Sequence, residues 1–377
     1  MSSNGHARAF LDELDLRGEE PIERAYTIPA SWYISPEAWA FEREAVFAGT
    51  WQLVARADQV AANGSVLETE VAGEPLLIIR DEEGELRAFY NVCRHRGGPI
   101  ARCPGSRTML QCRYHGWTYR LDGSLRGVPR FNRAELFDKR DYGLVPVKID
   151  RWEDFLFVSL DDHVRPLREH FAGICERMYP VAIGGLQFHS RVTYDMACNW
   201  KVYVDNFLEG YHLPYVHPEL CDILDLHAYK TELSTHYSLQ YSPIAAASNP
   251  YHVERGDAFY FFVFPNLMLN ILPDRLQTNV VLPLGADRCR VHFDYYYRDL
   301  TSSSALARIA DDLAYSDKVQ QEDIEICERV QEGLSSRSYH RGRFSVECEQ
   351  GVYHFQQLLR AAYRAKALVT GSSADKP

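Results

Sequence analysis

The 377-residue sequence contains no apolar segment long enough to cross a lipid bilayer. Its longest apolar stretch, FYFFVFPNLMLNIL, is too short and is interrupted by Pro265. The N-terminal residues MSSNGHARAFLDELDL lack the apolar core of a secretory signal peptide. We therefore expect neither a signal peptide nor any association with a membrane.

Positive charge and closely spaced cysteines are also scarce. There are 41 Lys and Arg residues against 52 Asp and Glu residues, which gives a formal net charge of -11. This balance argues against nucleic acid as a partner, because neutralising phosphates requires an excess of basic residues. The nine cysteines are scattered and odd in number, so no disulfide framework is expected and a reducing cytoplasm is the expected compartment. In that compartment, neighbouring Cys and His residues indicate metal ligation.

Three regions of the chain differ in their sequence patterns. Residues 1–44 are charged and weakly periodic until SPEAWAFEREAVFAGTW, which predicts a helix that begins after Ser35 and ends near Gly49. Residues 45–162 consist of short predicted strands separated by turns such as DEEGE and LDGS. Residues 163–377 combine strands with helices. Their predicted elements are a helix in NWKVYVDNFLEGYH, strands in AFYFFVFPNLMLNIL, QTNVVLPL and CRVHFDYYYRDL, a helix from about Ser303 to Leu334, and a final helix in GVYHFQQLLRAAYRAK.

Two short segments of the second region each place a cysteine close to a histidine. NVCRHRGGPI contains Cys93 and His95, and QCRYHGW contains Cys112 and His115. The same four ligands could form a structural zinc site, and ligand count alone favours zinc. The glycines favour a different group, because they let backbone amides approach closely enough to hydrogen-bond to inorganic sulfide. Both segments also connect predicted strands, whereas the second ligand pair of a zinc finger normally lies on a helix.

The third region holds further candidate ligands in NWKVYVDNFLEGYHLPYVH. His212 and His217 are five residues apart, which on a continuous helix would separate them by about 140°. Pro214 removes a backbone donor and is expected to end or distort that helix, so that both imidazoles can reach one point. Without another ligand, two unrelated surface histidines would be the simpler interpretation.

Asp323 is the candidate third ligand. In VQQEDIEICERVQEGL, apolar residues recur at helical spacing, and Asp323 falls within their stripe. Glu322, Glu325 and Glu328 point away from that stripe. A carboxylate on a buried helix face is costly unless it is paired or bound to a cation. Two histidines and one carboxylate form the facial triad of non-heme Fe(II) oxygenases, which leaves coordination positions open for O₂ and substrate.

These segments together resemble a known family. CRHRGG and CRYHGW resemble the cluster-binding loops of Rieske proteins. When the segments NWKVYVDNFLEGYHLPYVH and VQQEDIEICERVQEGL are added, nearly the whole chain resembles the catalytic α subunit of Rieske non-heme iron oxygenases. The resemblance implies an α+β fold, with a Rieske antiparallel β domain (45–162) inserted into a helix-grip, START-like catalytic domain (163–377). The N-terminal segment (1–44) would pack on the catalytic domain.

The resemblance also implies two cofactors, a [2Fe–2S] cluster and a mononuclear Fe(II). Cys93 and Cys112 would bind one iron of the cluster, and His95 and His115 the other, which raises its potential relative to an all-cysteine cluster. The residues implied at the mononuclear iron are His212, His217 and Asp323 as ligands, Glu209 as the acid that links the two metal centres, and Asp205 and Asn206 as further catalytic residues of the same pattern.

The implied activity is reductive activation of O₂, with one or both oxygen atoms entering a small organic substrate. A separate NAD(P)H-dependent flavin or iron–sulfur reductase would supply the electrons through the cluster. In the family this transfer crosses between subunits of a trimer, so a homotrimer is expected. A Rieske electron carrier is the non-enzyme alternative, but it would leave His212, His217 and Asp323 unexplained. A zinc-stapled binding protein would likewise leave Asp323 unexplained.

Glu209 and the run YHLPYVHP look most similar to the choline, betaine and carnitine oxygenase group, whereas many ring dioxygenases carry Asp at the linking position. The implied reaction is monooxygenation beside a quaternary or N-methylated nitrogen. Aromatic faces attract a desolvated quaternary ammonium by roughly 2 kcal/mol or more. An apolar pocket would equally suit a neutral ring, so an aromatic ring-hydroxylating dioxygenase or aryl-ether demethylase is the alternative. The predicted pocket residues are Phe207, Leu213, Phe261 and Asn270.

Overall fold

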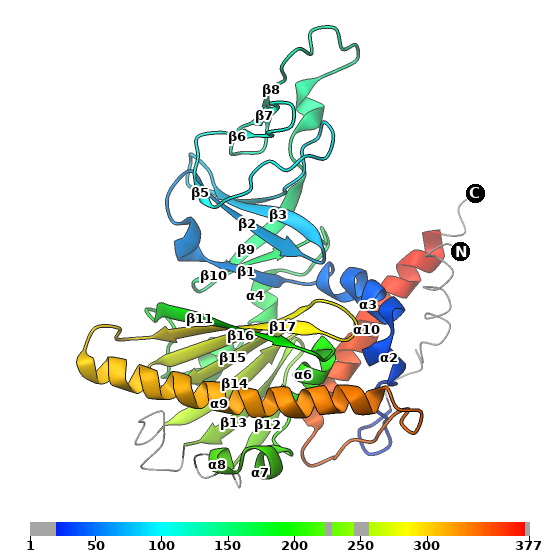
Figure 1. Ribbon diagram of the computed structural model, residues 1–377, viewed down its shortest axis with the longest axis vertical. Coiled ribbons are helices and arrows are strands. Elements are labelled where there is room, and N and C mark those ends of the chain that lie inside the picture. Colours follow the sequence, from blue (N-terminus) through cyan, green and yellow to red (C-terminus); the bar gives the residue numbers. More distant parts are fainter. Residues whose placement is uncertain (1–19, 222, 224–227, 245–255, 374–377) are drawn as a thin grey trace. The chain divides into compact units, whose positions relative to one another are not determined.

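The computed structural model of the chain describes residues 20–221, 223, 228–244 and 256–373. The chain folds into two compact units (Figure 1). The inserted unit runs from Val46 to Glu169, and the larger unit combines the chain before residue 46 with the chain from His170 onward. Among the residues that the structure describes, none of the helices is long and apolar enough to cross a membrane.

The inserted unit consists of two antiparallel sheets. Strand order is β1-β10-β9-β4-β3-β2-β5 in the larger sheet and β6-β7-β8 in the smaller one. Their bounds are β1 (Gln52–Arg56), β2 (Ser65–Val71), β3 (Glu74–Arg80), β4 (Leu86–Tyr90), β5 (Gly105–Ser106), β6 (Leu110–Gln111), β7 (Thr118–Tyr119), β8 (Leu125–Gly127), β9 (Pro146–Trp152) and β10 (Phe155–Ser159). Two 3-10 helices (Ala57–Val60 and Lys139–Tyr142) and α4 (Leu167–His170) complete this part of the chain.

Strand β3 is buried on both faces. Because successive side chains of a strand point to opposite faces, Leu76 and Ile78 pack in one apolar cluster, while Leu77 and Ile79 pack in another. The second cluster also contains both cysteines of the two Cys/His segments. The apolar run EPLLIIR thus packs against the two Cys/His segments.

The larger unit is built on one seven-stranded antiparallel sheet in the order β11-β17-β16-β15-β14-β13-β12. The three predicted strand segments of this region lie in that sheet, and AFYFFVFPNLMLNIL forms two strands that turn at Pro265. The bounds are β11 (Gln187–Met196), β12 (Lys230–Leu233), β13 (Tyr237–Pro243), β14 (Asp257–Val263), β15 (Leu267–Leu272), β16 (Arg275–Pro283) and β17 (Cys289–Tyr297).

Helix α9 (Ser303–Leu334) crosses one face of this sheet, and its bounds agree with the predicted helix (Figure 1). It is joined to the sheet by side-chain hydrogen bonds such as that from Tyr194 on β11 to Asp317, 2.9 Å long. The remaining helices are α2 (Ser31–Ile34), α3 (Pro36–Glu42), a π-helical turn (Arg43–Phe47), α5 (Ile174–Met178), α6 (Trp200–Phe207), α7 (Leu213–Val216), α8 (Pro218–Cys221) and α10 (Gln350–Ser373).

Ser35 caps α3 as predicted, since its hydroxyl oxygen accepts hydrogen bonds from the backbone N–H groups of Glu37 and Ala38. The α-helix ends at Glu42, earlier than the predicted end near Gly49, and continues as the π-helical turn. Glu42 is fully buried and forms a 2.5 Å ion pair with the equally buried Lys201. Trp200 and Tyr363 donate hydrogen bonds to the same carboxylate. The ion pair and these hydrogen bonds together join α3, α6 and α10 and fix the position of α6.

Candidate functional site

The two Cys/His segments form matching turns in the inserted unit. Gly97 N–H donates to the carbonyl of Cys93 over 3.0 Å, and Gly116 N–H donates to the carbonyl of Cys112 over 2.9 Å. Both glycines have positive φ, 70° and 76° respectively, a conformation that side chains with a Cβ rarely adopt. Space is also tight at Gly98, because a Cβ there would lie 3.0 Å from Cys112 Sγ.

The four candidate ligands differ in solvent exposure. Cys93 and Cys112 are buried, whereas His95 is half-buried and His115 is exposed. The two imidazole rings lie 4.7 Å apart between centroids, and Trp117 stacks on His95 at 4.8 Å. An inner pair of thiols and an outer pair of imidazoles fit a [2Fe–2S] cluster with one iron on each pair.

Surrounding groups suit this cluster. Burial raises the pKa of the Cys93 thiol, and burial together with the neighbouring His115 lowers the pKa of His95, which favours the neutral imidazole that binds iron. The Tyr119 hydroxyl lies 3.2 Å from Cys93 Sγ and accepts the N–H of Arg94. Hydrogen bonds to ligand sulfur atoms are one of the means by which proteins set cluster potentials.

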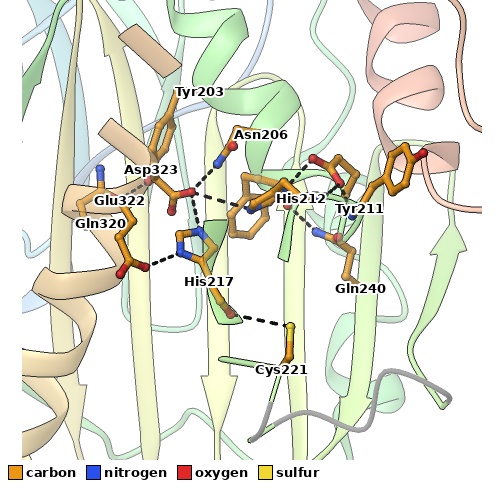
Figure 2. A network of polar contacts seen from close by, with 12 residues as sticks. Tyr203, Asn206, Tyr211, His212, His217, Cys221, Gln240, Gln320, Glu322 and Asp323 are labelled. Atoms are coloured by element: carbon orange, nitrogen blue, oxygen red, sulfur yellow. Dashed lines mark hydrogen bonds and ion pairs between the residues drawn. The ribbon is translucent and has the colours of Figure 1, made fainter. Parts of the chain in front are cut away.

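A second group of candidate ligands lies in the larger unit, at the meeting of α6, α7 and α9. The ligand atoms of His212, His217 and Asp323 all lie within 4.8 Å of one another. Asp323 Oδ1 is 2.9 Å from His217 Nε2 and 3.8 Å from His212 Nε2 (Figure 2). Donor atoms of this type and spacing can contact one metal ion, so the sequence-based triad fits a mononuclear iron.

A break in the helix brings the two histidines together. Helix α6 ends at Phe207, earlier than the predicted end near Pro214, and the short helix α7 begins at Leu213 with Pro214 in its first turn. Glu209 stabilises the intervening turn, because its Oε2 accepts the N–H groups of Tyr211 and His212. Its Oε1 lies 2.7 Å from His212 Nδ1 and orients that ring.

Two further side chains orient the other ligands. Asn206 donates its side-chain amide to Asp323 Oδ1 over 2.7 Å (Figure 2). Glu322 Oε2 lies 2.7 Å from His217 Nδ1. Burial lowers the pKa of His217, but the carboxylates of Asp323 and Glu322 outweigh this effect and raise it. Such partners fix the ring orientation and basicity of metal-binding histidines.

Sequence analysis did not identify the role of Glu322, because its position on α9 faces away from the apolar stripe. Asp205 occupies a different environment from the one expected for a catalytic acid. Its carboxylate accepts a 2.5 Å hydrogen bond from Tyr33 and weaker ones from Gln356, instead of contacting the triad. Loss of hydration raises the pKa of Asp205 to about 7. Asp205 therefore joins α6 to α2 and α10, whereas its neighbour Asn206 reaches the candidate metal ligands.

The triad borders a cavity of about 140 Å³ between α6, α9 and the sheet. Three of the four predicted pocket residues, Phe207, Leu213 and Asn270, line it. The exception is Phe261, which is fully buried on the opposite face of β14 from Tyr260, where it packs with Phe259. The prediction thus assigned Phe261 to the wrong face of the strand. Its neighbour Tyr260 lines the cavity instead.

The rest of the cavity wall is unexpectedly polar. Part of it is a row of side chains that pair across neighbouring strands, from Gln240 through Tyr260 and Asn270 to Gln277. The polar lining residues are Gln240, Asn270, Arg275, Gln277, Asn279, Ser316 and Gln320, together with the tyrosines Tyr203, Tyr229 and Tyr260. Sequence analysis missed this feature, although the alternation R-L-Q-T-N at residues 275–279 would have indicated a polar strand face.

Comparison with known proteins identifies the families of both domains. Residues 50–143 match the Rieske [2Fe-2S] domain family, and residues 183–365 match the ring hydroxylating alpha subunit (catalytic domain). The chain is 35% identical over 353 residues to the chloroplastic choline monooxygenase of Arabidopsis thaliana, covering 90% of this chain and 83% of that protein. It is 31% identical to the carnitine monooxygenase oxygenase subunit of Acinetobacter baumannii, covering 89% and 94% of the two chains.

Solved structures give the same result. A structure of a quaternary ammonium Rieske monooxygenase superposes with a TM-score of 0.81 at 30% identity, over 90% of this chain and 96% of that one. The complex of CntA with L-carnitine gives a TM-score of 0.78. A naphthalene 1,2-dioxygenase, at 18% identity and a TM-score of 0.74, shares the fold. The chain belongs to the Rieske-type oxygenases, with a Rieske [2Fe–2S] domain and the iron-binding catalytic domain of their α subunits.

Proposed function

We propose that this oxygenase hydroxylates or demethylates a small quaternary ammonium or N-methyl compound by monooxygenation. The observation that carries the proposal is the cavity beside the triad, which combines aromatic faces with a polar wall. The relatives named for choline and carnitine oxidation support the same substrate class.

In this proposal, His212, His217 and Asp323 hold the mononuclear iron, and Cys93, Cys112, His95 and His115 hold the cluster. When bound, the two groups supply the electron transfer and O₂ activation of the family. Asn206 and Glu322 orient Asp323 and His217 through the 2.7 Å contacts described above. Glu209 fixes the His212 ring and serves as the acid that links the two centres.

The cavity's chemistry distinguishes the proposed substrate from an arene, although its size does not. An engineered cavity of about 150 Å³ holds benzene, so a neutral ring would fit in about 140 Å³. An unsubstituted arene, however, would bury the amide groups of the polar wall without hydrogen-bond partners, which is unfavourable, whereas the hydroxyl or carboxylate oxygens of compounds such as choline and carnitine can accept from them. A quaternary ammonium gains from the faces of Phe207, Tyr229 and Tyr260. An aromatic ring dioxygenase or aryl-ether demethylase is therefore the weaker candidate.

The electron donor, the oligomeric state and the compartment are also proposals. We infer that a separate NAD(P)H-dependent reductase supplies electrons and that the chain works as a homotrimer, as in its family. Inter-subunit electron transfer is attributed to a quaternary ammonium Rieske monooxygenase of 30% identity. No disulfide joins any of the nine cysteines, all of which the structure describes, and we infer a reducing cytoplasm as the compartment.

The proposal is tested by substrate-dependent O₂ uptake and product analysis with the purified, iron-loaded protein and a supplied reductase. Choline, glycine betaine, carnitine and stachydrine are compared with benzoates and aryl ethers. Coupled turnover of at least one ammonium compound is expected, and turnover restricted to neutral aromatics would refute the proposal.

His217→Ala should abolish product formation while the visible spectrum of the cluster persists. His340→Ala is a matched control, since His340 is an exposed histidine of the same unit and its removal should leave turnover unchanged.

A further inference from the structure

One strand supplies an ordered row of polar groups to the cavity. Arg275, Gln277 and Asn279 alternate along β16, so their side chains share one face of the sheet. All three line the cavity beside the triad. Leu276 and Thr278 lie between them and point to the opposite face, where both are buried.

The hydrogen bonds of this row have a fixed direction. Arg275 Nη2 donates to Gln277 Oε1 over 2.7 Å. A guanidinium has only donors, so the oxygen of the Gln277 amide has to face it. The Ser316 hydroxyl donates to the same oxygen over 3.2 Å. The nitrogen of Gln277 therefore points along the strand and donates to Asn279 Oδ1 over 2.8 Å.

The same logic orients Asn279. Its oxygen is occupied by Gln277, so its NH₂ group forms the free end of the row. Among the described residues the structure shows no hydrogen bond from this NH₂, and Asn279, only 3% exposed as a whole residue, lines the cavity, so the NH₂ is available to a ligand or water there. A nearly buried donor without a protein partner is unfavourable unless a ligand or water completes it.

Arg275, the first residue of the row, is fixed by contacts with Asp312. Arg275 Nε forms a 2.6 Å ion pair with Asp312 of α9, and Tyr297 donates a 2.5 Å hydrogen bond to the same carboxylate oxygen. Because Asp312 balances the charge of Arg275, the wall presents an oriented donor instead of a net positive charge. Such a donor suits a hydroxyl oxygen as well as a carboxylate oxygen.

We infer that Asn279 is a specificity-determining residue, whose side-chain NH₂ donates a hydrogen bond to an oxygen atom on the substrate. The inference rests on the proposed function and narrows its substrate class. The substrate carries, besides its quaternary ammonium group, an arm with a hydroxyl or carboxylate oxygen that reaches the β16 wall. Arg275 and Gln277 are positioning residues that fix the direction of the Asn279 amide.

The inference is tested with pairs of ammonium compounds in which a hydrocarbon group of similar size replaces the hydroxyl or carboxylate group. Choline is paired with n-propyltrimethylammonium, and γ-butyrobetaine with n-pentyltrimethylammonium. The wild-type enzyme should favour the oxygenated member of the pair it turns over by about 10- to 100-fold in kcat/KM, since a site built to donate a hydrogen bond discriminates against an analogue without the acceptor.

The informative variant is Asn279→Asp, which keeps the size of the side chain and an oxygen for Gln277 but replaces the terminal donor by an acceptor. We expect this variant to lose the preference, mainly through weaker binding of the oxygenated compound. The dissociation constants are measured by anaerobic calorimetry on the iron-loaded protein, alongside kcat/KM. Asn279→Leu, which removes the amide completely, should show the same loss of preference.

Three results would contradict the inference. Equal efficiency of the wild-type enzyme toward both members of a pair would overturn it and leave the proposed function intact. An equal decrease for both members in Asn279→Asp would show that Asn279 has only a structural role. If neither these compounds nor any other ammonium compound were turned over, the proposed function would fail, and this inference would fail with it.

Discussion

Glu322 and His217 are joined by a 2.7 Å contact between Oε2 and Nδ1, on the opposite side of the imidazole from Asp323. Two adjacent residues of α9 thus hold both nitrogen atoms of one ring. The ring lies between them in Figure 2. Of the two acids, only Asp323 faces His212 as well, and we therefore assign it as the ligand and Glu322 as the group that orients the ring.

Glu322→Gln should weaken iron binding by about 10- to 100-fold, because the ring loses its charged acceptor. The measurement is iron occupancy of the larger unit during titration with a chelator, while the cluster spectrum serves as an internal reference. Glu325→Gln is the matched control, since Glu325 is an exposed acid on the same helix. Equal effects of the two substitutions would contradict the assignment.

Tyr119→Phe should lower the reduction potential of the cluster. The substitution removes the hydroxyl that lies 3.2 Å from Cys93 Sγ, and a hydrogen bond to a ligand sulfur stabilises the more negative, reduced state. The potential is measured by spectroelectrochemical titration. Tyr114→Phe removes a hydroxyl from an exposed tyrosine beside His115 and should leave the potential unchanged.

Lys201→Met should destabilise the larger unit by about 3–5 kcal/mol, because it leaves the buried Glu42 carboxylate without its counter-ion. Its effect is measured by urea unfolding of the cofactor-loaded protein. Lys318→Met removes the cation of a solvent-exposed pair with Glu219, and it should cost less than about 1 kcal/mol. A similarly small effect of both substitutions would show that the buried pair is not needed for stability.

Stability should fall with rising pH through the titration of Asp205. Its pKa is raised from the ordinary 3.8 to about 7 by loss of hydration, so the folded protein binds this proton more tightly than the unfolded chain does. The contribution of Asp205 to stability is complete below about pH 4 and is lost as the pH rises to about 7.

Asp205→Asn keeps an oxygen acceptor for Tyr33 and should remove this dependence. The free energy of unfolding of both proteins is compared at pH 5 and pH 8. The wild-type protein should lose stability relative to the variant between these values, and parallel curves would contradict the prediction.

The residues with metal-binding chemistry could be located from the sequence because each signal was local. Helical periodicity singled out Asp323, and Pro214 indicated the break before His217. Roles that depend on contacts between distant segments could not be located in this way. Glu322 lies off the apolar stripe of its own helix, and only the approach of α7 gives it a partner.

The error at Phe261 has a related cause. In a strand buried on both faces, hydrophobicity does not distinguish one face from the other. The phase of β14 is set by its register with β13 and β15, where Tyr260 pairs with Gln240 and Asn270. Polar and non-polar residues do alternate visibly around Asn279. The polar face, however, depends on the ion pair between Arg275 and Asp312, and Asp312 lies some thirty residues later, on α9.

The division of the larger unit between the two ends of the chain has a consequence for its synthesis. Ile28 donates its N–H to the side chain of Gln356, and Glu42 is bound by Tyr363 on the last helix. On the ribosome, the N-terminal segment must therefore wait for α10 before it finds these partners. The inserted unit has all its strands by Ser159 and can fold as chain growth continues. We expect the iron–sulfur cluster to be installed first and the mononuclear iron to be acquired after release.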